Sequence, residues 1–147
     1  MKLSEHFSAE ELGVSGAFTG AVENARVLCE RVLERVRERF GKQVVVHCGM
    51  RSVQHNTAVG GKAHSWHLFE GGKAAADFHV AGEDMRRVFN WMRLESDLPF
   101  DKVILESSAD GTPACIHVQM DRLAEPRRLA YTGSTGAGTI YRPEVVA

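Results

Sequence analysis

Apolar residues in the first third of the chain recur at intervals of three and four, the period of an α-helix. Between residues 22 and 40 they form one stripe, while charged residues such as Arg31, Glu34 and Arg35 cover the opposite side. The stripe consists of Ala25, Leu28, Cys29, Val32, Leu33, Val36 and Phe40. Because Gly41 is well suited to follow a helix C-terminus, we predict a helix from about Val22 to Phe40.

Two further helices are predicted from their N-terminal signals. Ser8 and Glu11 have the spacing of a capping box, which predicts a short helix near the N-terminus. The stretch Gly82-Glu83-Asp84 precedes a second amphipathic segment. Its apolar residues are Met85, Val88, Phe89, Trp91 and Met92.

Short runs predict strands in the remainder of the chain, the first of which (QVVVHC) is β-branched and typical of a buried strand. These runs are residues 43–48, 74–80, 102–106 and 115–120. The last two flank the loop SSADGTPA, so we expect them to pair antiparallel. Residues 122–147 are rich in Gly, Thr and Pro and are expected to be irregular, apart from one further strand at 128–131. Helices first and a mostly antiparallel sheet later predict an α+β fold, in one domain spanning residues 1–147.

Composition and charge exclude several classes of function. The 147 residues are 44% hydrophobic and 25% charged, and 18 basic against 19 acidic residues give a net charge of −1. The densest basic stretches, Arg86-Arg87 and Arg127-Arg128, are too short for a nucleic-acid footprint, so no nucleic-acid partner is expected. No apolar run approaches the ~20 residues of a membrane span, and the N-terminus lacks a secretory signal. We expect a soluble monomer made in the cytoplasm, which could leave the cell by lysis or as part of a phage particle.

The three cysteines predict neither a disulfide framework nor a cysteine-zinc site. Cys29, Cys48 and Cys115 are odd in number, far apart and without a CxxC pair. We therefore expect reduced thiols, most of them buried.

Histidine and aspartate residues raise the question of a metal site. A zinc hydrolase needs about three protein ligands from His, Asp or Glu and one open position for water. His67, Asp77 and His117 form such a set, each beside or inside a predicted strand. Residues of this kind in a strand are more often structural, and His64 and His79 leave the choice of ligands open.

A longer motif gives this set a context. The stretch GMRSVQHNTAVGGKAHSWH resembles the signature of zinc D-alanyl-D-alanine carboxypeptidases and related phage endolysin peptidases, which share a metallopeptidase fold with lysostaphin and the hedgehog signalling domain. The opening LSEHFSAEEL is also similar to the start of this family, so the resemblance extends to about residue 120. The matching positions are Gly49, Arg51, Ser52, Asn56, Val59, Gly60, Gly61, Ser65, His67, Asp77 and His117.

The resemblance implies a zinc ion (Zn2+) held by His67, Asp77 and His117, and a peptidoglycan stem peptide as the partner. Arg51 then suits a substrate carboxylate or amide oxygen, although a salt bridge that holds the fold is an equal alternative. Ser65 either hydrogen-bonds the substrate or fixes the His67 loop. Gly60 and Gly61 are expected in a turn that requires positive φ.

The sequence departs from the family pattern at two places. His67 and Asp77 are ten residues apart where the family usually has seven, so the loop contains an insertion that includes Glu70, which we expect to be a surface residue. The usual acidic general base, three residues before the last histidine, is replaced by Ala114. Glu106 and Asp110 are the nearest acidic residues that could take its place, although a structural role is the default for each.

Three hypotheses about function follow. The first is a zinc peptidase that hydrolyses an amide bond of peptidoglycan stem peptides, next to D-alanine. The second is a degenerate zinc-binding module that holds a cell-wall peptide without cutting it. The third is a zinc hydrolase of some other small amide.

Overall fold

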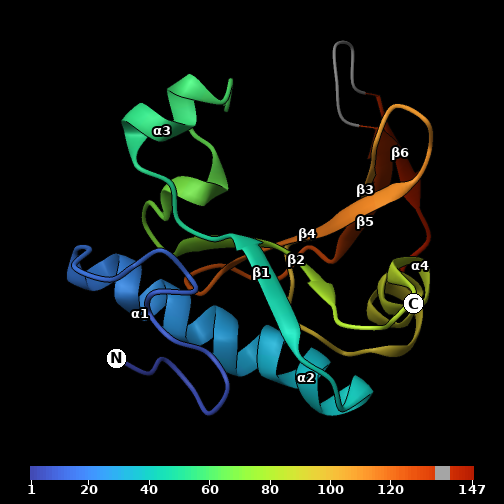
Figure 1. The fold of residues 1–147 in the computed structure, drawn as a ribbon, viewed down its shortest axis with the longest axis horizontal. Helices are drawn as coiled ribbons and strands as arrows, with labels where there is room; N and C mark the ends of the chain where they lie inside the picture. Colours follow the sequence, from blue (N-terminus) through green and yellow to red (C-terminus); the bar gives the residue numbers. More distant parts are fainter. Residues whose placement is uncertain (135–139) are drawn as a thin grey trace.

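A long helical segment forms the first layer of the molecule (Figure 1). The computed structural model describes residues 1–134 and 140–147. The segment consists of α1 (Thr19–Leu28), a π-helical turn η1 (Cys29–Leu33) and α2 (Glu34–Phe40), so it begins three residues before the prediction and ends where predicted. Gly41 follows it with φ of 65°, the left-handed cap that glycine favours. The predicted stripe from Ala25 to Val36 is fully buried, which confirms the helix and its apolar face.

The predicted helix at Ser8 is wrong. The capping-box bonds are present, since the Ser8 N–H donates to Glu11 Oε1 (3.1 Å) and the Glu11 N–H donates to Ser8 Oγ (3.2 Å). The segment nevertheless forms only turns, because Gly13 takes φ of 70° one turn later and redirects the chain. A side chain at Gly13 would lie 2.8 Å from the Met50 carbonyl oxygen, so this reversal packs closely against another segment.

Six strands form one sheet in the order β1-β2-β4-β3-β5-β6. Every neighbouring pair is antiparallel except β3 and β5, which are parallel. This arrangement of helices and a mostly antiparallel sheet confirms the α+β class. The strands are β1 (Val44–Cys48), β2 (Lys73–Val80), β3 (Lys102–Ser107), β4 (Pro113–Asp121), β5 (Leu129–Ser134) and β6 (Tyr141–Glu144). The region after residue 122 therefore contains two strands, where only one at 128–131 was expected.

The two faces of the sheet have different surroundings. The first helical segment contacts β2 and β4, and the second, α4 (Met85–Asn90) with the π turn η3 (Trp91–Glu95), contacts β2, β3 and β4. Alternate strand residues such as Phe78, Ile116 and Leu105 are buried beneath these helices. The intervening residues, among them Asp77 and His117, lie on the opposite face. No helix in the described part of the chain is long and apolar enough to cross a membrane.

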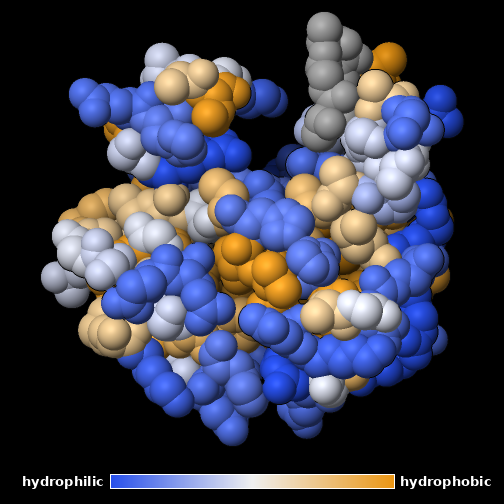
Figure 2. Space-filling view, viewed as in Figure 1, coloured by the Kyte–Doolittle hydropathy of each residue, from blue (hydrophilic) through white to orange (hydrophobic). Residues whose placement is uncertain are grey.

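The segment between β1 and β2 was expected to be a loop but contains two short helices. These are α3 (Val53–Ala58), whose first turn is capped by Ser52, and the 3-10 turn η2 (Trp66–Leu68). The α3 lobe projects past the end of β1, away from the first helical segment (Figure 1). The surface is hollowed between this lobe and the end of the sheet that carries β6 (Figure 2).

Candidate metal centre

His67, Asp77 and His117 come together from three segments on the open face of the sheet. Asp77 of β2 and His117 of β4 are direct cross-strand neighbours, and His67 approaches from η2. His117 Nδ1 lies 2.9 Å from Asp77 Oδ1, and His67 Nε2 lies 3.4 Å from Asp77 Oδ2. The two imidazole rings meet edge to face with centroids 5.2 Å apart. Two ring nitrogens thus point at one carboxylate.

The remaining nitrogen of His67 is fixed by the backbone. Its Nδ1 is 2.8 Å from the Gly49 carbonyl oxygen, so Nδ1 carries a proton and Nε2 is the nitrogen that faces Asp77 and would bind a metal. The Ser65 hydroxyl oxygen accepts a hydrogen bond from the His67 N–H (3.2 Å), which caps η2. Ser65 therefore fixes the His67 loop, and its side chain also lines the adjoining cavity.

The remaining nitrogen of His117 belongs to a chain of buried polar groups. His117 Nε2 lies 2.8 Å from Gln119 Oε1, and the amide nitrogen of Gln119 donates to Asp101 Oδ2 (2.8 Å). Asp101 accepts two hydrogen bonds from Arg127, at 2.6 and 2.9 Å. Because an amide oxygen can only accept, His117 Nε2 carries a proton, and Nδ1, which faces Asp77, is the nitrogen that would bind a metal.

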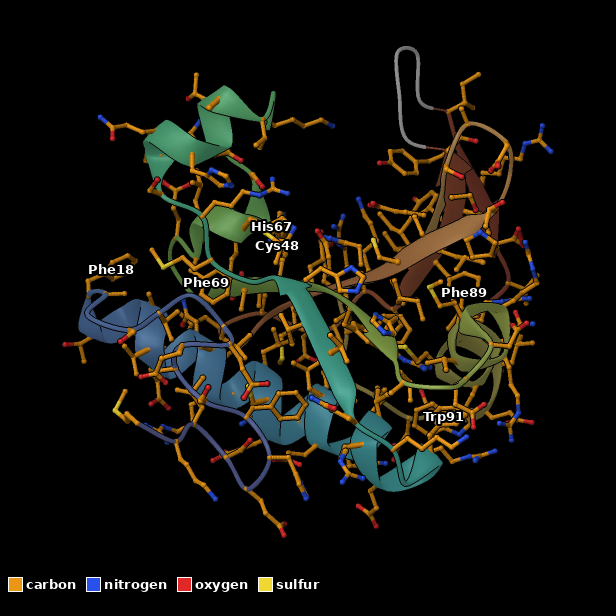
Figure 3. The ribbon with its side chains drawn as sticks, in the orientation of Figure 1. Phe18, Cys48, His67, Phe69, Phe89 and Trp91 are labelled. Atoms are coloured by element: carbon orange, nitrogen blue, oxygen red, sulfur yellow. The ribbon has the colours of Figure 1, made fainter. Side chains whose placement is uncertain are left out.

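His67, Asp77 and His117 offer donor types that zinc favours, although the three ligand atoms do not all lie within 4.8 Å of one another. Ligand atoms about 2.0–2.1 Å from zinc in a tetrahedron are separated by roughly 3.3 Å, and the two separations from the Asp77 carboxylate oxygens, 2.9 and 3.4 Å, are close to this value. Asp77 belongs to two groups whose ligand atoms all lie within 4.8 Å of one another, one with Cys48 and His67 and one with Glu106 and His117. Figure 3 places Cys48 next to His67, and the two side chains are 3.8 Å apart from Sγ to Nδ1.

The electrostatics of the trio follow from its hydrogen bonds. Burial alone would raise the pKa of Asp77, but hydrogen bonds from His117 and His67 hold it well below its usual range. Burial alone would lower the pKa of His67, but hydrogen bonding to Asp77 and Cys48 raises it to about 9. Asp77 is thus an anion held between two nitrogen donors, as a site for a divalent cation requires.

Of the two acidic candidates for general base, only Glu106 reaches the site. It lies on β3 and its carboxylate is grouped with Asp77 and His117. Burial, followed by the charge of Asp77, raises the pKa of Glu106 above its ordinary value. Asp110 instead lies exposed in the β3–β4 hairpin, where it accepts hydrogen bonds from the Ser108 hydroxyl and the Thr112 N–H. The structure does not bring Asp110 to the site.

Arg51 borders the metal centre on the other side. Its Nη2 lies 3.9 Å from Asp77 Oδ2, and its Nη1 donates to Asn56 Oδ1 (3.4 Å). Asn56 is buried and also donates to the Lys62 carbonyl oxygen. A side chain at Gly61 would collide with the Asn56 amide at 2.0 Å, so Gly61 is required for this close approach. Only Gly60 takes the positive φ (76°) that was expected of both glycines.

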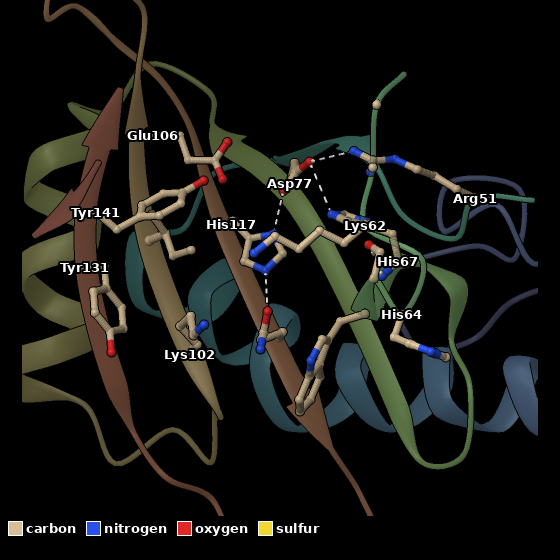
Figure 4. A pocket seen from close by; sticks show the side chains of 16 residues that line it. Arg51, Lys62, His64, His67, Asp77, Lys102, Glu106, His117, Tyr131 and Tyr141 are labelled. Carbon is tan, nitrogen blue, oxygen red and sulfur yellow. Dashed lines mark hydrogen bonds and ion pairs between the residues drawn. The ribbon is translucent and has the colours of Figure 1, made fainter. Parts of the chain in front are cut away.

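A cavity of about 590 Å³ opens over these residues (Figure 4). Arg51 lies on one side of His117 in this view and Lys102 on the other. Lys62 and Lys102 both line the cavity, and within the described part of the chain no carboxylate lies within 4 Å of either ammonium group. The Lys102 ammonium group lies 5.4 Å from the centroid of the Tyr131 ring. The lining is rich in cations and therefore suits an anionic ligand.

The other histidines considered as ligands are not among the grouped metal donors, although His64 lines the cavity. His79 Nδ1 is 2.5 Å from His47 Nε2, so His79 pairs with β1 and is not part of either group of metal donors. His64 is exposed and lies 3.7 Å from Glu70, which is also exposed and does not line the cavity. These positions agree with the expectation that Glu70 is a surface residue.

The insertion between His67 and Asp77 is held in place by hydrogen bonds from helix α1. Phe69 and Gly71 take φ of 56° and 57°, which folds the inserted residues into a compact turn. The side-chain nitrogen of Asn24, on α1, lies 2.8–3.1 Å from the carbonyl oxygens of Phe69, Gly71 and Lys73. The longer loop therefore keeps a fixed path from His67 to Asp77.

Comparison with known proteins identifies the class. The model of the family described as Peptidase M15 matches residues 5–109, which is more than half of the chain. The protein therefore belongs to the M15 family of metallopeptidases, the zinc D-Ala-D-Ala carboxypeptidase-like group. No curated protein matches the chain. His117 lies beyond the matched residues, so its place beside Asp77 rests on the structure.

Several residues of this site were missed by reasoning from the sequence. Gln119 could have been found, because it is two residues from His117 and must share its face of the strand. The cysteine expectation needs one correction, since Cys29 is buried but Cys48 and Cys115 are only half-buried at the site. Tyr141 had no local signal, because its place depends on strands that pair over long distances.

Proposed function

We propose that the protein is a zinc-dependent peptidase that hydrolyses an amide bond of peptidoglycan stem peptides, next to D-alanine. His67, Asp77 and His117 would hold the zinc ion. The observation that carries the proposal is the convergence of His67 Nε2 and His117 Nδ1 on the Asp77 carboxylate, with the Glu106 carboxylate beside it. Zinc in such a site supplies a Lewis acid for the scissile carbonyl and lowers the pKa of a bound water toward ~7.

Glu106 would be the general base in place of Ala114. It faces the cavity beside the proposed ligands, and its raised pKa suits a group that must both accept and release a proton. In this mechanism Glu106 takes a proton from the attacking water and delivers it to the leaving amine. In the family pattern the carboxylate comes from a residue shortly before the last histidine, the position that Ala114 occupies here. In this protein the carboxylate would instead come from Glu106 on the neighbouring strand β3.

Arg51 and the two lysines would bind the acidic part of the substrate. The Arg51 guanidinium is held by Asn56 at Nη1 and lies 3.9 Å from Asp77 at Nη2, so it is positioned at the edge of the metal centre, where a peptide carboxylate or amide oxygen could bind it. Lys62 and Lys102 lie in the same cavity and add positive charge. A stem peptide that ends in D-alanine carries a terminal carboxylate and matches this lining.

The metal ligands are tested by zinc content. Protein purified without chelator should hold about one zinc per chain. His67→Ala, Asp77→Ala and His117→Ala should each abolish zinc binding, measured by elemental analysis. His79→Ala and His64→Ala serve as matched controls and should retain the metal. Full zinc content in all three ligand variants would rule out the site, and loss in His79→Ala would reassign a ligand.

The general base is tested by hydrolysis. Glu106→Gln should lower kcat by about 10²- to 10⁴-fold with zinc content unchanged, whereas Asp110→Asn should leave the rate unchanged. Ala114→Glu should not increase the rate of hydrolysis, because Glu106 already acts as the general base. The assay is release of D-alanine or cleaved stem peptide from peptidoglycan fragments. Zinc-loaded wild type that binds these fragments but cleaves none of them would identify the protein as a non-catalytic binding module.

A further inference from the structure

Glu106, Gly133 and Tyr141 lie next to one another on the neighbouring strands β3, β5 and β6. Glu106 of β3 is the register partner of Gly133 on β5, and Gly133 is in turn the partner of Tyr141 on β6. Glu106 and Tyr141 are therefore two strands apart, with only a glycine between them. Tyr141 lies outside residues 5–109, the part of the chain that the family model matches.

The glycine leaves room for the tyrosine ring to cross the middle strand. A Cβ atom at Gly133 would lie 2.4 Å from Tyr141 Cδ1 and 2.7 Å from Tyr141 Cε1. These distances are far below ordinary contact, so the ring occupies the place that any side chain on β5 would need. The ring thus lies over β5 and extends toward β3.

The phenol reaches the cavity beside the proposed general base. Figure 4 shows the hydroxyl of Tyr141 directed toward the carboxylate of Glu106, and both residues line the cavity. Burial, followed by the negative charges of Glu106 and Asp77, raises the pKa of Tyr141 above its usual value. The phenol is therefore a neutral hydrogen-bond donor at neutral pH.

We propose that Tyr141 is a catalytic residue whose hydroxyl donates a hydrogen bond to the substrate's carbonyl oxygen as that oxygen becomes anionic. The inference rests on the proposed function. A water oxygen bonds to the carbonyl carbon, one water proton passes to Glu106, and the carbonyl π electrons become the oxygen lone pair that Tyr141 stabilises. When the carbon–nitrogen bond breaks, the amine nitrogen takes the proton from Glu106 and the carbonyl re-forms. Tyr141 keeps its own proton throughout.

The neighbouring tyrosine of the cavity provides a matched control. Tyr131 lies on β5 and its ring is the platform for the Lys102 ammonium group, at 5.4 Å. In Figure 4 its hydroxyl points away from His117, unlike that of Tyr141. Tyr131→Phe removes the same atom from the same cavity, and it should leave the catalytic rate near the wild-type value.

The experiment compares Tyr141→Phe, Gly133→Ala and their combination. Loss of a single oxyanion donor typically lowers kcat about 10²- to 10³-fold, and KM should change little. Gly133→Ala should lower kcat too, because its methyl group displaces the ring. The double variant should be no slower than Tyr141→Phe alone, since both changes remove the same interaction. Zinc content should be the same in all of them.

Binding supplies a readout that does not depend on turnover. A phosphinic peptide, which mimics the tetrahedral anion, should bind Tyr141→Phe about 10²-fold more weakly than wild type by calorimetry, while the cleaved peptide product binds both equally. If wild type cleaves the substrate and Tyr141→Phe matches it in kcat and phosphinic-peptide affinity, the role of Tyr141 is overturned and the proposed function stands. If wild type neither cleaves the substrate nor binds the phosphinic peptide, both are overturned.

Discussion

At the scale of single residues, the orientation of His117 depends on its partner Gln119. The Gln119 amide can be held in one orientation only if its nitrogen end is satisfied, and Asp101 provides that acceptor. Asp101 is itself oriented by two hydrogen bonds from Arg127. The chain of contacts therefore determines which imidazole nitrogen of His117 is available to a metal. Such outer partners commonly affect metal affinity by 10- to 100-fold.

Gln119→Met should weaken zinc binding without unfolding the protein. Methionine has a similar volume but offers no amide oxygen to accept the His117 Nε2 proton, so the ring is free to rotate. We expect a loss of about 10- to 100-fold in zinc affinity, measured by competition with a chromophoric chelator. Gln54→Met, on the exposed face of α3, is the control. Equal affinities in the two variants would contradict the positioning role of Gln119.

Zinc binding should release a proton from His67. The pKa of His67 is about 9 without metal, so the ring is protonated at pH 7 and must lose that proton to coordinate zinc. Zinc affinity should therefore rise as the pH increases toward 9 and then level off. Calorimetry at pH 7 in buffers of different ionisation enthalpy should show release of about one proton from this ring. No dependence on buffer would show that His67 is neutral before zinc binds.

At the scale of elements, one buried asparagine connects the first helix to the metal-binding segment. Asn24 donates toward three carbonyl oxygens of the inserted turn, and its own oxygen accepts a hydrogen bond from Arg122 Nε at 2.6 Å. Arg122 directly follows β4, the strand of His117. Asn24 thus connects α1 both to the turn between His67 and Asp77 and to the end of the strand that carries His117.

Asn24→Leu should destabilise the protein strongly. The substitution leaves buried carbonyl groups of the 69–73 turn without a donor, which should lower the free energy of unfolding by about 2 to 4 kcal/mol. Urea denaturation of the zinc-free protein measures this change. Asn90→Ala provides the comparison, because half-buried Asn90 accepts a hydrogen bond from Arg93 one turn along the helix and supports no buried carbonyl groups among the described residues, so its effect should stay below about 1 kcal/mol. Similar losses for both variants would show that the turn does not depend on Asn24.

The elements that could be predicted from the sequence are those determined by local periodicity. The stripe from Ala25 to Phe40 specified the long helix, and short apolar runs located β1 through β4. The Ser8 capping box failed because its two hydrogen bonds stabilise a turn as well as a helix, and Gly13 then redirects the chain. α3 was missed because its six residues carry no apolar stripe. β6 was missed because its only partner is β5, and neither strand has a marked alternation.

At the scale of the whole molecule, the site is formed by contacts between segments far apart in sequence. The grouping of His67, Asp77 and His117 was predicted by resemblance to a family, since spacing alone left other histidines open. Glu106 was one of two equal candidates, and the β3–β4 pairing places Glu106 beside Asp77 and His117 while Asp110 lies in the exposed hairpin. A loop, the 3-10 turn η2 and five strands, β2 to β6, all contribute residues to one cavity. A zinc ion would therefore connect parts of the fold that the backbone hydrogen bonds hold separately.

Zinc should consequently raise the thermal stability of the protein. A ligand that binds only the folded chain, at a free concentration 1,000-fold above its Kd, adds about 4 kcal/mol to the free energy of unfolding. For a chain of this length that corresponds to an increase in Tm of roughly 8 to 16 °C over protein treated with chelator. His117→Ala should show no zinc-dependent shift, whereas Glu106→Gln should retain most of it, because Glu106 is assigned to the proton and not to the metal. A loss of the shift in Glu106→Gln as large as that in His117→Ala would instead make Glu106 a metal ligand, and the general base would have to be sought among other groups.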